Sequence, residues 1–366
     1  MTVSNYRPIS LLKVLSKVLE KVVNNRLLSY LENHNLISNN QYGFRTKKST
    51  EDAVICLSNI ATKHMDQRLK CLAVFLDLKK AFDTVSIPLL LRKMECLGIR
   101  GTPLAWFKDY LKGRSQTVKV LDYTSNTQKV THGIPQGSTL GPTLFLIYAN
   151  EMCDLELDNA QIIAFADDTA IIFHGGTWEE TRKTAEKGLA KIRKTLENNL
   201  LTINAQKTKY ICFSITPATQ PPTNFTLKLH SLQCTTLEFP PNDCSCAILD
   251  KESSMRYLGV IIDENLNWHP HITALSNRVR RLIPVFRNLR DIVDNKLITL
   301  VYKALCQSLL IYCISAWGGA ATTHMTEEST NPPWASTVDY PFSSWEETHA
   351  IWRVVLGFDM MMIMKR

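Results

Sequence analysis

The chain has 366 residues, of which 45% are hydrophobic and 21% are charged. This balance is typical of a folded globular protein with more than one lobe, and it excludes disordered, collagen-like and fibrous chains. Lys and Arg (42) outnumber Asp and Glu (34), which leaves a net charge of +8 and favours nucleic acid as a partner.

The number of cysteines and the length of the apolar runs indicate the cellular compartment. The 10 cysteines are too dilute for a disulfide-stapled scaffold, which favours a reducing compartment. We interpret the closest pair, Cys244 and Cys246, as chance thiols in a loop, because no histidine or second cysteine pair stands at a ligand spacing. No signal core is present in residues 1–10, and the apolar stretch 304–317 is shorter than the roughly 18 residues of a membrane span. We therefore expect an intracellular protein, nuclear or cytoplasmic, that is neither secreted nor inserted in a membrane.

The first half of the chain alternates helices and strands. Helical spacing of leucines predicts an amphipathic helix over 10–31, and Ser49 with Asp52 forms a capping box for a helix over 51–65. A continuous apolar run over 71–77 predicts a buried strand that ends on Asp77. Further helices are expected over 86–97, 102–112 and 142–150, short strands over 116–121 and 128–130, and a Gly- and Pro-rich loop over 133–141.

The second half begins with a predicted hairpin. Two apolar strands, 162–165 and 169–173, are joined through Ala166, Asp167 and Asp168. The remaining expected elements are a helix capped by Thr177 that runs to about Leu200, strands over 210–213 and 255–262, and helices over 271–289 and 294–314. The alternation lacks the regular period of a doubly wound fold, so we predict an α+β sheet with helices on one face.

Carboxylates lie at the end of the predicted strand over 71–77 and at the tip of the predicted hairpin. Asp77 closes the first strand, and Asp167 and Asp168 lie at the tip of the hairpin. Such groups are costly unless their charge is compensated, and a divalent cation is the natural compensator. An isolated aspartate would be read as a turn residue or helix cap. The three together favour a magnesium site for phosphoryl transfer.

These residues fall within blocks that follow one another in a recognisable order. The blocks are 6–12, 41–45 with Ser49 and Thr50, 75–83, 133–138, 165–168, Asn204 with Lys207 and Thr208, and 257–260. In these blocks, from about Asn5 to Ala320, the sequence resembles the reverse transcriptase of non-LTR retrotransposons, especially the jockey-like group of insect elements.

The resemblance implies a right-hand polymerase fold, with an antiparallel palm sheet backed by helices. It also implies RNA-directed DNA polymerase activity with two Mg²⁺ ions, Mn²⁺ being a possible substitute, and as partners an RNA template, a DNA primer and deoxynucleoside triphosphates. The implied division is fingers over 1–70, the first catalytic palm block over 71–85, a fingers/palm insertion over 86–132, palm over 133–262, partial thumb over 263–320 and an unassigned tail over 321–366.

The same resemblance implies roles for individual residues. Asp77 and Asp167 would hold the metal ions, Asp168 would support them, and Lys207 would lie near the leaving pyrophosphate. The resemblance also implies which residues contact the substrates. Arg7 would bind the triphosphate, Arg45 the template, Phe82 the nucleotide sugar, and Gln136 and Gly137 the incoming nucleotide. Tyr257, Leu258 and Gly259 would support the primer end, and Arg278 and Arg281 would bind the duplex backbone. Without the resemblance, Phe82 would be an ordinary core residue and the thumb arginines a solvated helix face.

Both ends depart from the family pattern. The strand that normally precedes Tyr6, the endonuclease region and the sequence beyond Ala320 have no counterpart here, so we expect a copy truncated at both ends. The alternatives are an active polymerase fragment, a catalytically silent remnant that only binds nucleic acid, a group II intron maturase or a different metal phosphotransferase. A maturase would need a basic splicing domain, for which 321–366 is too short.

Overall fold

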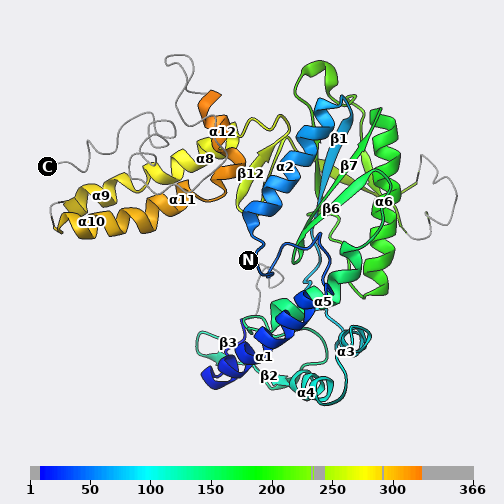
Figure 1. The fold of residues 1–366 in the computed structure, drawn as a ribbon, viewed down its shortest axis with the longest axis vertical. Helices are drawn as coiled ribbons and strands as arrows, with labels where there is room; N and C mark the ends of the chain where they lie inside the picture. The colour runs from blue at the N-terminus through cyan, green and yellow to red at the C-terminus, as the bar shows by residue number, and fades with distance from the viewer. Residues whose placement is uncertain (1–8, 232–233, 235–243, 291, 324–366) are drawn as a thin grey trace.

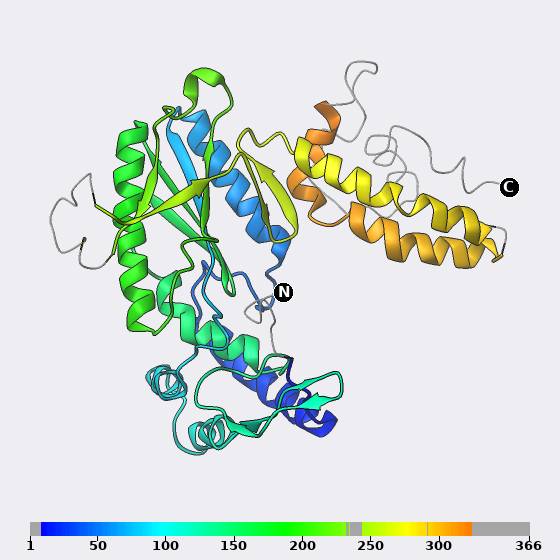
Figure 2. The same ribbon diagram turned by 180° about the vertical axis from the view of Figure 1, so that it is seen from behind.

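The computed structural model of the chain describes residues 9–231, 234, 244–290 and 292–323. A central sheet carries helices, a second lobe extends from one end of that sheet, and a helical arm extends from its side (Figure 1). The view from behind shows the same three parts (Figure 2). Arg7 and most of the predicted tail, 324–366, lie outside the described residues.

The central sheet has its most buried strand near the middle. Its order is β6 (Ala160–Phe165), β7 (Asp168–Gly175), β1 (Lys70–Leu76), β8 (Lys209–Phe213), β10 (Ala247–Lys251) and β9 (Leu227–Leu229). All neighbours are antiparallel except β10 and β8, which are parallel. Apart from Lys70, every residue of β1 is buried, as its continuous apolar run predicts. Strands β9 and β10 were not predicted, because β9 has only three residues and β10 buries only Leu249, which leaves little apolar pattern.

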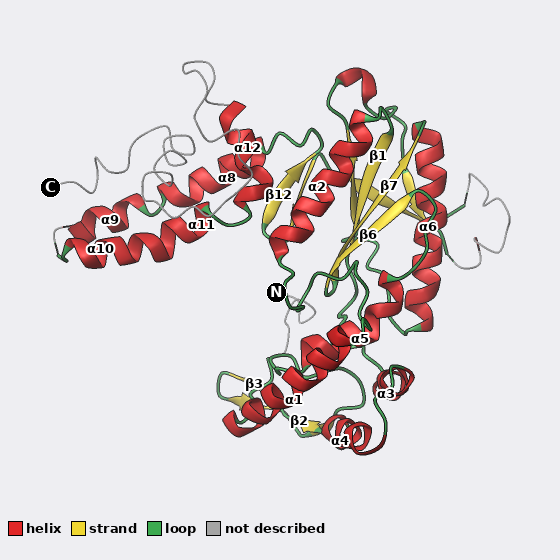
Figure 3. Ribbon diagram, in the orientation of Figure 1, coloured by secondary structure: helices red, strands yellow, loops and turns green. Residues whose placement is uncertain are grey.

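Both faces of this sheet are covered, which corrects the prediction of helices on one face. Alternate residues of β1 point to opposite sides, so Leu72 and Val74 join one core cluster while Ala73 and Phe75 join another. Helices α5 (Gly141–Cys153) and α6 (Trp178–Asn198) pack on the first side, and α2 (Thr50–Asp66) packs on the second (Figure 3). A strand that is apolar at every position needs both faces covered.

The predicted helix starts at α2 and α6 are confirmed. Ser49 accepts a hydrogen bond from the backbone N–H of Asp52, and the Asp52 carboxylate accepts one from the Ser49 N–H, which completes the capping box. Thr177 accepts a hydrogen bond from the Glu180 N–H at the start of α6. These local signals were sufficient because they involve residues three positions apart.

The second lobe contains α1 (Val14–Asn33), α3 (Ile87–Cys96) and α4 (Gly101–Leu111). It also carries two short ribbons, β2 (Ser115–Gln116) with β5 (Gln128–Lys129) and β3 (Lys119–Val120) with β4 (Tyr123–Thr124). Helix α1 differs from the expected amphipathic pattern, since Leu15 and Leu19 are exposed while Glu20 is buried. The Glu20 carboxylate is compensated by hydrogen bonds from the Tyr110 hydroxyl at 2.9 Å and the Thr139 N–H at 2.7 Å.

A hairpin replaces the single strand predicted over 255–262. It consists of β11 (Ser254–Tyr257) and β12 (Val260–Asp263), joined by a turn at Leu258 and Gly259 with φ values of 46° and 87°. Positive φ at both turn residues is the geometry of the tight hairpin turn that glycine favours. The apolar run of this segment concealed the turn because Gly259 was its only turn signal.

The arm is more broken than the two predicted helices. Its elements are α8 (His269–Arg280), α9 (Ile283–Arg290), α10 (Asn295–Tyr302), a π-helical segment at Lys303–Gln307, α11 (Ser308–Leu310) and α12 (Ile314–Thr323). Trp317 of α12 is fully buried, and its ring centroid lies 5.3 Å from that of His271 on α8. This contact joins the last described helix to the base of the arm.

Protonation of His271 is expected to weaken the arm at low pH. The ring is buried, and its Nδ1 accepts a hydrogen bond from the Ile261 N–H at 3.3 Å. Burial, together with the positive charge of Arg256, lowers the pKa of His271 to about 4. The unfolded chain, with a histidine pKa of about 6.5, binds this proton first, so stability should fall as pH drops from 6.5 towards 4, by up to about 3 kcal/mol.

Urea unfolding at several pH values between 7.5 and 4.5 measures this effect. His271→Asn keeps an acceptor near the Ile261 N–H but cannot titrate in this range, so its free energy of unfolding should depend less steeply on pH. Equal pH slopes for the parent chain and this variant would contradict the assignment.

Candidate active site

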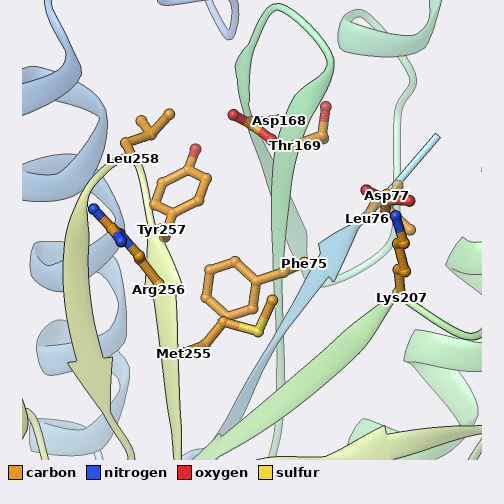
Figure 4. Close-up of a pocket in the computed structure, with 10 residues that line it drawn as sticks. All are labelled: Phe75, Leu76, Asp77, Asp168, Thr169, Lys207, Met255, Arg256, Tyr257 and Leu258. Atoms are coloured by element: carbon orange, nitrogen blue, oxygen red, sulfur yellow. The ribbon is translucent and has the colours of Figure 1, made fainter. Parts of the chain in front are cut away.

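Asp77 and Asp168 lie side by side on neighbouring strands. The β1–β7 register pairs Leu76 with Thr169, which places Asp77 and Asp168 at the next position along both strands. Both carboxylates line one pocket, with Lys207 beside Asp77 and with Tyr257 and Leu258 across from it (Figure 4). The structure thus brings together aspartates that are far apart in the sequence.

The Asp77 carboxylate is held by the turn that follows α6. Asn204 Nδ2 donates to Asp77 Oδ2 at 2.9 Å, and the Asn204 N–H donates to the Asp77 carbonyl at 2.8 Å. The Asp77 N–H in turn donates to Thr208 Oγ1 at 3.2 Å. Asn204 therefore orients the carboxylate, a role that its place in a sequence block did not indicate.

The hairpin between β6 and β7 turns through Ala166 and Asp167. Ala166 has a φ of 58°, a conformation that is uncommon for a residue with a side chain. Asp167 is half-buried in the turn, whereas the exposed Asp168 is the hairpin aspartate that lines the pocket. Positive φ at Ala166 persists only because surrounding contacts hold the turn.

Gln41 supplies those contacts. Its side-chain oxygen, buried with the rest of the residue, accepts hydrogen bonds from the Ala166 N–H at 3.0 Å and from the Gly43 N–H at 2.8 Å. The Tyr42 N–H donates to the Ala164 carbonyl at 2.7 Å. The 41–45 block therefore braces the aspartate hairpin, and sequence reasoning missed Gln41 because nothing local marks a buried amide.

The two segments approach each other closely at Gly43. A Cβ at this position would lie 2.6 Å from the Ala166 nitrogen and 3.0 Å from the Phe165 carbonyl carbon, both backbone atoms. Only a residue without a side chain fits here.

Arg45 is engaged with protein groups. Its guanidinium forms an ion pair with Glu32, with Nη2 2.5 Å from Oε2, and Nη1 donates to the Ser38 carbonyl at 2.6 Å. The hydrogen bond from Arg45 lowers the pKa of Glu32, so the pair stays charged. These contacts do not support the predicted template contact, because the guanidinium would have to leave a nearly complete set of partners.

The β11–β12 hairpin forms the far wall of the pocket. The Tyr257 hydroxyl donates to the Ile163 carbonyl at 3.2 Å, and its ring lies 5.4 Å from that of Phe75. Burial and the negative charge of Asp168 raise the pKa of Tyr257, so this phenol stays neutral. The Tyr312 hydroxyl donates to the Leu258 carbonyl at 2.7 Å, which ties the turn to the arm.

The Gly- and Pro-rich loop lies against the turn after Asp77. Gln136 Nε2 donates to Asp83 Oδ1 at 2.8 Å, and the Gln136 carbonyl accepts from the Ser10 N–H at 2.9 Å. Gly137, with a φ of 97°, is exposed next to Gln136. Gln136 and Gly137, which are predicted to contact the nucleotide, thus lie close to Ser10.

Phe82 occupies an intermediate environment. Its ring is half-buried and stacks on that of the buried Phe145, with centroids 4.5 Å apart. If Phe82 has the sugar-contacting role that the resemblance implies, Phe82→Ala is expected to lower ribonucleotide exclusion at least about tenfold. Because the ring is only half-buried, the change should cost less than the roughly 3–5 kcal/mol of a fully buried phenylalanine.

Steady-state incorporation of matched deoxy- and ribonucleotides measures this selectivity. Phe107→Ala is the control, because Phe107 is buried in the second lobe and should cost stability without changing sugar selectivity. Unchanged selectivity in Phe82→Ala, with a large loss of stability, would make Phe82 a core residue only.

The predicted thumb arginines lie on the outside of the arm. Arg278 of α8 and Arg281 directly after it are exposed, while Leu275 and Val279 of α8 are buried. The basic face is therefore available to an anionic partner, and the helix begins next to the hairpin that carries Tyr257.

Comparison with known proteins identifies the family. The family model for reverse transcriptase (RNA-dependent DNA polymerase) matches residues 2–262. The chain therefore belongs to the reverse transcriptase family, and the right-hand fold class predicted from the sequence is confirmed.

Relatives from insects confirm the predicted jockey-like group. The chain is 29% identical to a probable RNA-directed DNA polymerase from transposon BS of Drosophila melanogaster, over 87% of this chain and 34% of that protein. It is 28% identical to the RNA-directed DNA polymerase from mobile element jockey of the same species, over 89% of this chain and 34% of that protein. The chain thus spans about a third of the length of these relatives. Telomerase from Candida albicans overlaps 87% of this chain and 49% of its own, with a TM-score of 0.46 and 12% identity, which is too loose for a functional comparison.

Proposed function

We propose that this chain carries the polymerase centre of a non-LTR retrotransposon reverse transcriptase, and that it transfers deoxynucleotides to the 3′-hydroxyl of a primer on an RNA template. The observation that carries the proposal is the adjacency of Asp77 and Asp168 at one pocket edge, opposite the Tyr257–Leu258 turn. Family membership supports the reaction type. The central sheet would then be the palm, the second lobe the fingers and the arm the thumb. Helix α2, which falls in the range 1–70 predicted as fingers, packs on the palm sheet.

The donor set at this edge fits a hard divalent cation. Reverse transcriptases generally use divalent metal ions, and carboxylate oxygens are the ligands that Mg²⁺ prefers. Asp77 and Asp168 offer such oxygens at adjacent positions, with Asp167 next in the turn. Two Mg²⁺ ions bound there would activate the primer hydroxyl and neutralise charge on the phosphates.

The chain's own residues position the reactants. Asn204 fixes the Asp77 carboxylate, and the exposed Lys207 ammonium beside it can hold the departing pyrophosphate by charge. Gln136 and Gly137 would contact the incoming nucleotide, and Phe82 would lie beneath its sugar. Tyr257, Leu258 and Gly259 support the primer end. Arg7 would grip the triphosphate.

Primer extension tests the proposal. The purified chain should extend a DNA primer on an RNA template with deoxynucleotides and Mg²⁺. A parallel reaction with Mn²⁺ compares the extension rates that the two ions support. Products should follow the template sequence and stop when a chelator is added. Tight binding of the primer–template with no extension under either ion would instead identify a silent remnant.

The basic face of α8 is expected to bind the duplex backbone. Affinity for a primer–template should fall steeply with salt, and Arg278→Gln with Arg281→Gln should flatten the log–log slope by about one unit for each phosphate that is no longer neutralised. Lys183→Gln with Lys187→Gln on α6 removes equal charge from another exposed surface and is the control. A slope unchanged by the arginine pair would place these residues on a solvated face.

No membrane partner enters the proposal. In the described part of the chain, helices are either too short or too polar to cross a bilayer.

A further inference from the structure

A cluster of one histidine and three cysteines lies at the outer edge of the sheet, away from the pocket. Its members are His230, Cys234, Cys244 and Cys246, whose ligand atoms all lie within 4.8 Å of one another. His230 follows β9 and Cys246 precedes β10, so the cluster closes the connection between these paired strands. We propose that these four side chains bind a structural zinc ion, which replaces the interpretation of Cys244 and Cys246 as chance thiols in a loop.

The spacing of the donor atoms suits tetrahedral zinc. Zn–S bonds of about 2.3 Å and a Zn–N bond of about 2.0–2.1 Å separate the donor atoms by roughly 3.5–3.8 Å. Cys244 Sγ lies 3.4 Å from His230 Nδ1, and the widest separation of 4.8 Å requires only a small contraction. Three thiolates and one imidazole form a closed set that selects zinc over the hard cations suited to Asp77 and Asp168.

The surroundings of His230 are those of a metal-binding histidine. The residue is only 4% exposed, and its Nε2 makes no hydrogen bond but lies 3.6 Å from Glu186 Oε2. Glu186 is itself fixed, because Oε1 accepts from the Lys228 N–H at 3.1 Å and Oε2 from Arg182 at 3.0 Å. With Nδ1 on the metal, Nε2 would carry the proton and face this carboxylate, which is the usual outer partner of a zinc-bound histidine.

Polar donors also lie close to two of the thiol sulfurs. The Ser231 N–H donates to Cys246 Sγ at 3.3 Å, and Lys228 Nζ lies 3.9 Å from Cys244 Sγ. Three thiolates and Zn²⁺ sum to one negative charge, which the Lys228 ammonium offsets. Loss of the thiol protons on binding is the expected chemistry of such a site.

A zinc ion here would strengthen the weakest edge of the sheet. Strand β9 pairs with β10 at only three positions, Ala247–Leu229, Ile248–Lys228 and Leu249–Leu227, and β10 pairs with β8 at two. Strand β8 pairs in turn with β1, which ends at Asp77. The zinc would thus fix the outer strands without taking part in catalysis.

Metal analysis of the whole purified chain tests the proposal. Protein made with zinc in the medium and kept reduced should contain about one zinc per chain by elemental mass spectrometry. Replacement by Co²⁺ should give the visible absorption of a tetrahedral cobalt site together with thiolate charge-transfer bands. Removing the metal with a chelator should lower the melting temperature, and adding zinc should restore it.

Single substitutions locate the site. Cys244→Ser, Cys246→Ser and His230→Asn should each weaken cobalt binding at least about tenfold, whereas Cys96→Ser, which removes an exposed thiol at the end of α3, should leave it unchanged. Circular dichroism and primer–template binding monitor folding, and His230→Asn keeps all thiols if a serine variant fails to fold. Zinc-free protein that takes up no cobalt, a disulfide between two of the cluster cysteines in freshly isolated protein, or binding unaffected by these substitutions would each overturn the proposal.

Discussion

Replacing Asp77, Asp167 or Asp168 by asparagine should reduce primer extension at least about 100-fold, which corresponds to about 2.7 kcal/mol in the barrier. The amide has nearly the shape of the carboxylate but no charge, so it cannot compensate a divalent ion. For Asp77, the hydrogen bond from Asn204 Nδ2 can be kept by the amide oxygen, so loss of activity would reflect charge rather than misplacement. Single-turnover extension at saturating primer–template measures the chemical step.

Asp158→Asn is the matched control for these substitutions. Asp158 is an exposed carboxylate paired with Lys187, and exposed pairs of this kind contribute little to stability. Its removal should leave extension unchanged. The active-site variants should bind primer–template at least as tightly as the parent chain, because each loses a negative charge. Extension by Asp168→Asn at the parental rate would show that the pocket at the end of β1 and β7 is not the catalytic centre.

Gly43→Ala should also reduce extension by about 100-fold, although Gly43 does not line the pocket. The added methyl group would meet the backbone of Phe165 and Ala166 at 2.6–3.0 Å, and backbone atoms cannot rotate away as a side chain can. The aspartate hairpin must therefore shift, and a displacement of about 1 Å can cost 100-fold in rate. Because the same shift strains the Gln41 hydrogen bonds, a small loss of stability should accompany it.

Gly319→Ala provides the comparison for this glycine. Gly319 lies in α12, and outside its own helix no atom of the described residues stands within 4 Å of the position its Cβ would take, so alanine should be neutral or slightly stabilising there. Gln41→Ala should resemble Gly43→Ala in activity, since it removes the acceptor shared by Ala166 and Gly43. Normal extension by Gly43→Ala, with an unchanged melting temperature, would show that the hairpin is not held by this contact.

Local sequence patterns determined much of the fold. The buried strand that ends at Asp77, the hairpin around Asp167 and Asp168, and the helix starts at Ser49 and Thr177 were all predictable. Each depends on residues within a few positions of one another, where capping, apolar alternation and turn chemistry act directly. The prediction that the three aspartates bind a divalent ion depends on the same local patterns.

Tertiary structure decided which distant residues meet. Gln41 reaches Ala166 across 125 positions, and Asn204 reaches Asp77 across 127. Those contacts depend on strand register and on the coverage of both sheet faces, which no local pattern specifies. The same reason explains why Arg45 pairs with Glu32 and why His230 lies beside Cys246. A side chain's partners are set by the packing of the elements that carry it, whereas local sequence patterns set most of the elements but not the turn at Leu258 and Gly259 or the breaks in the arm.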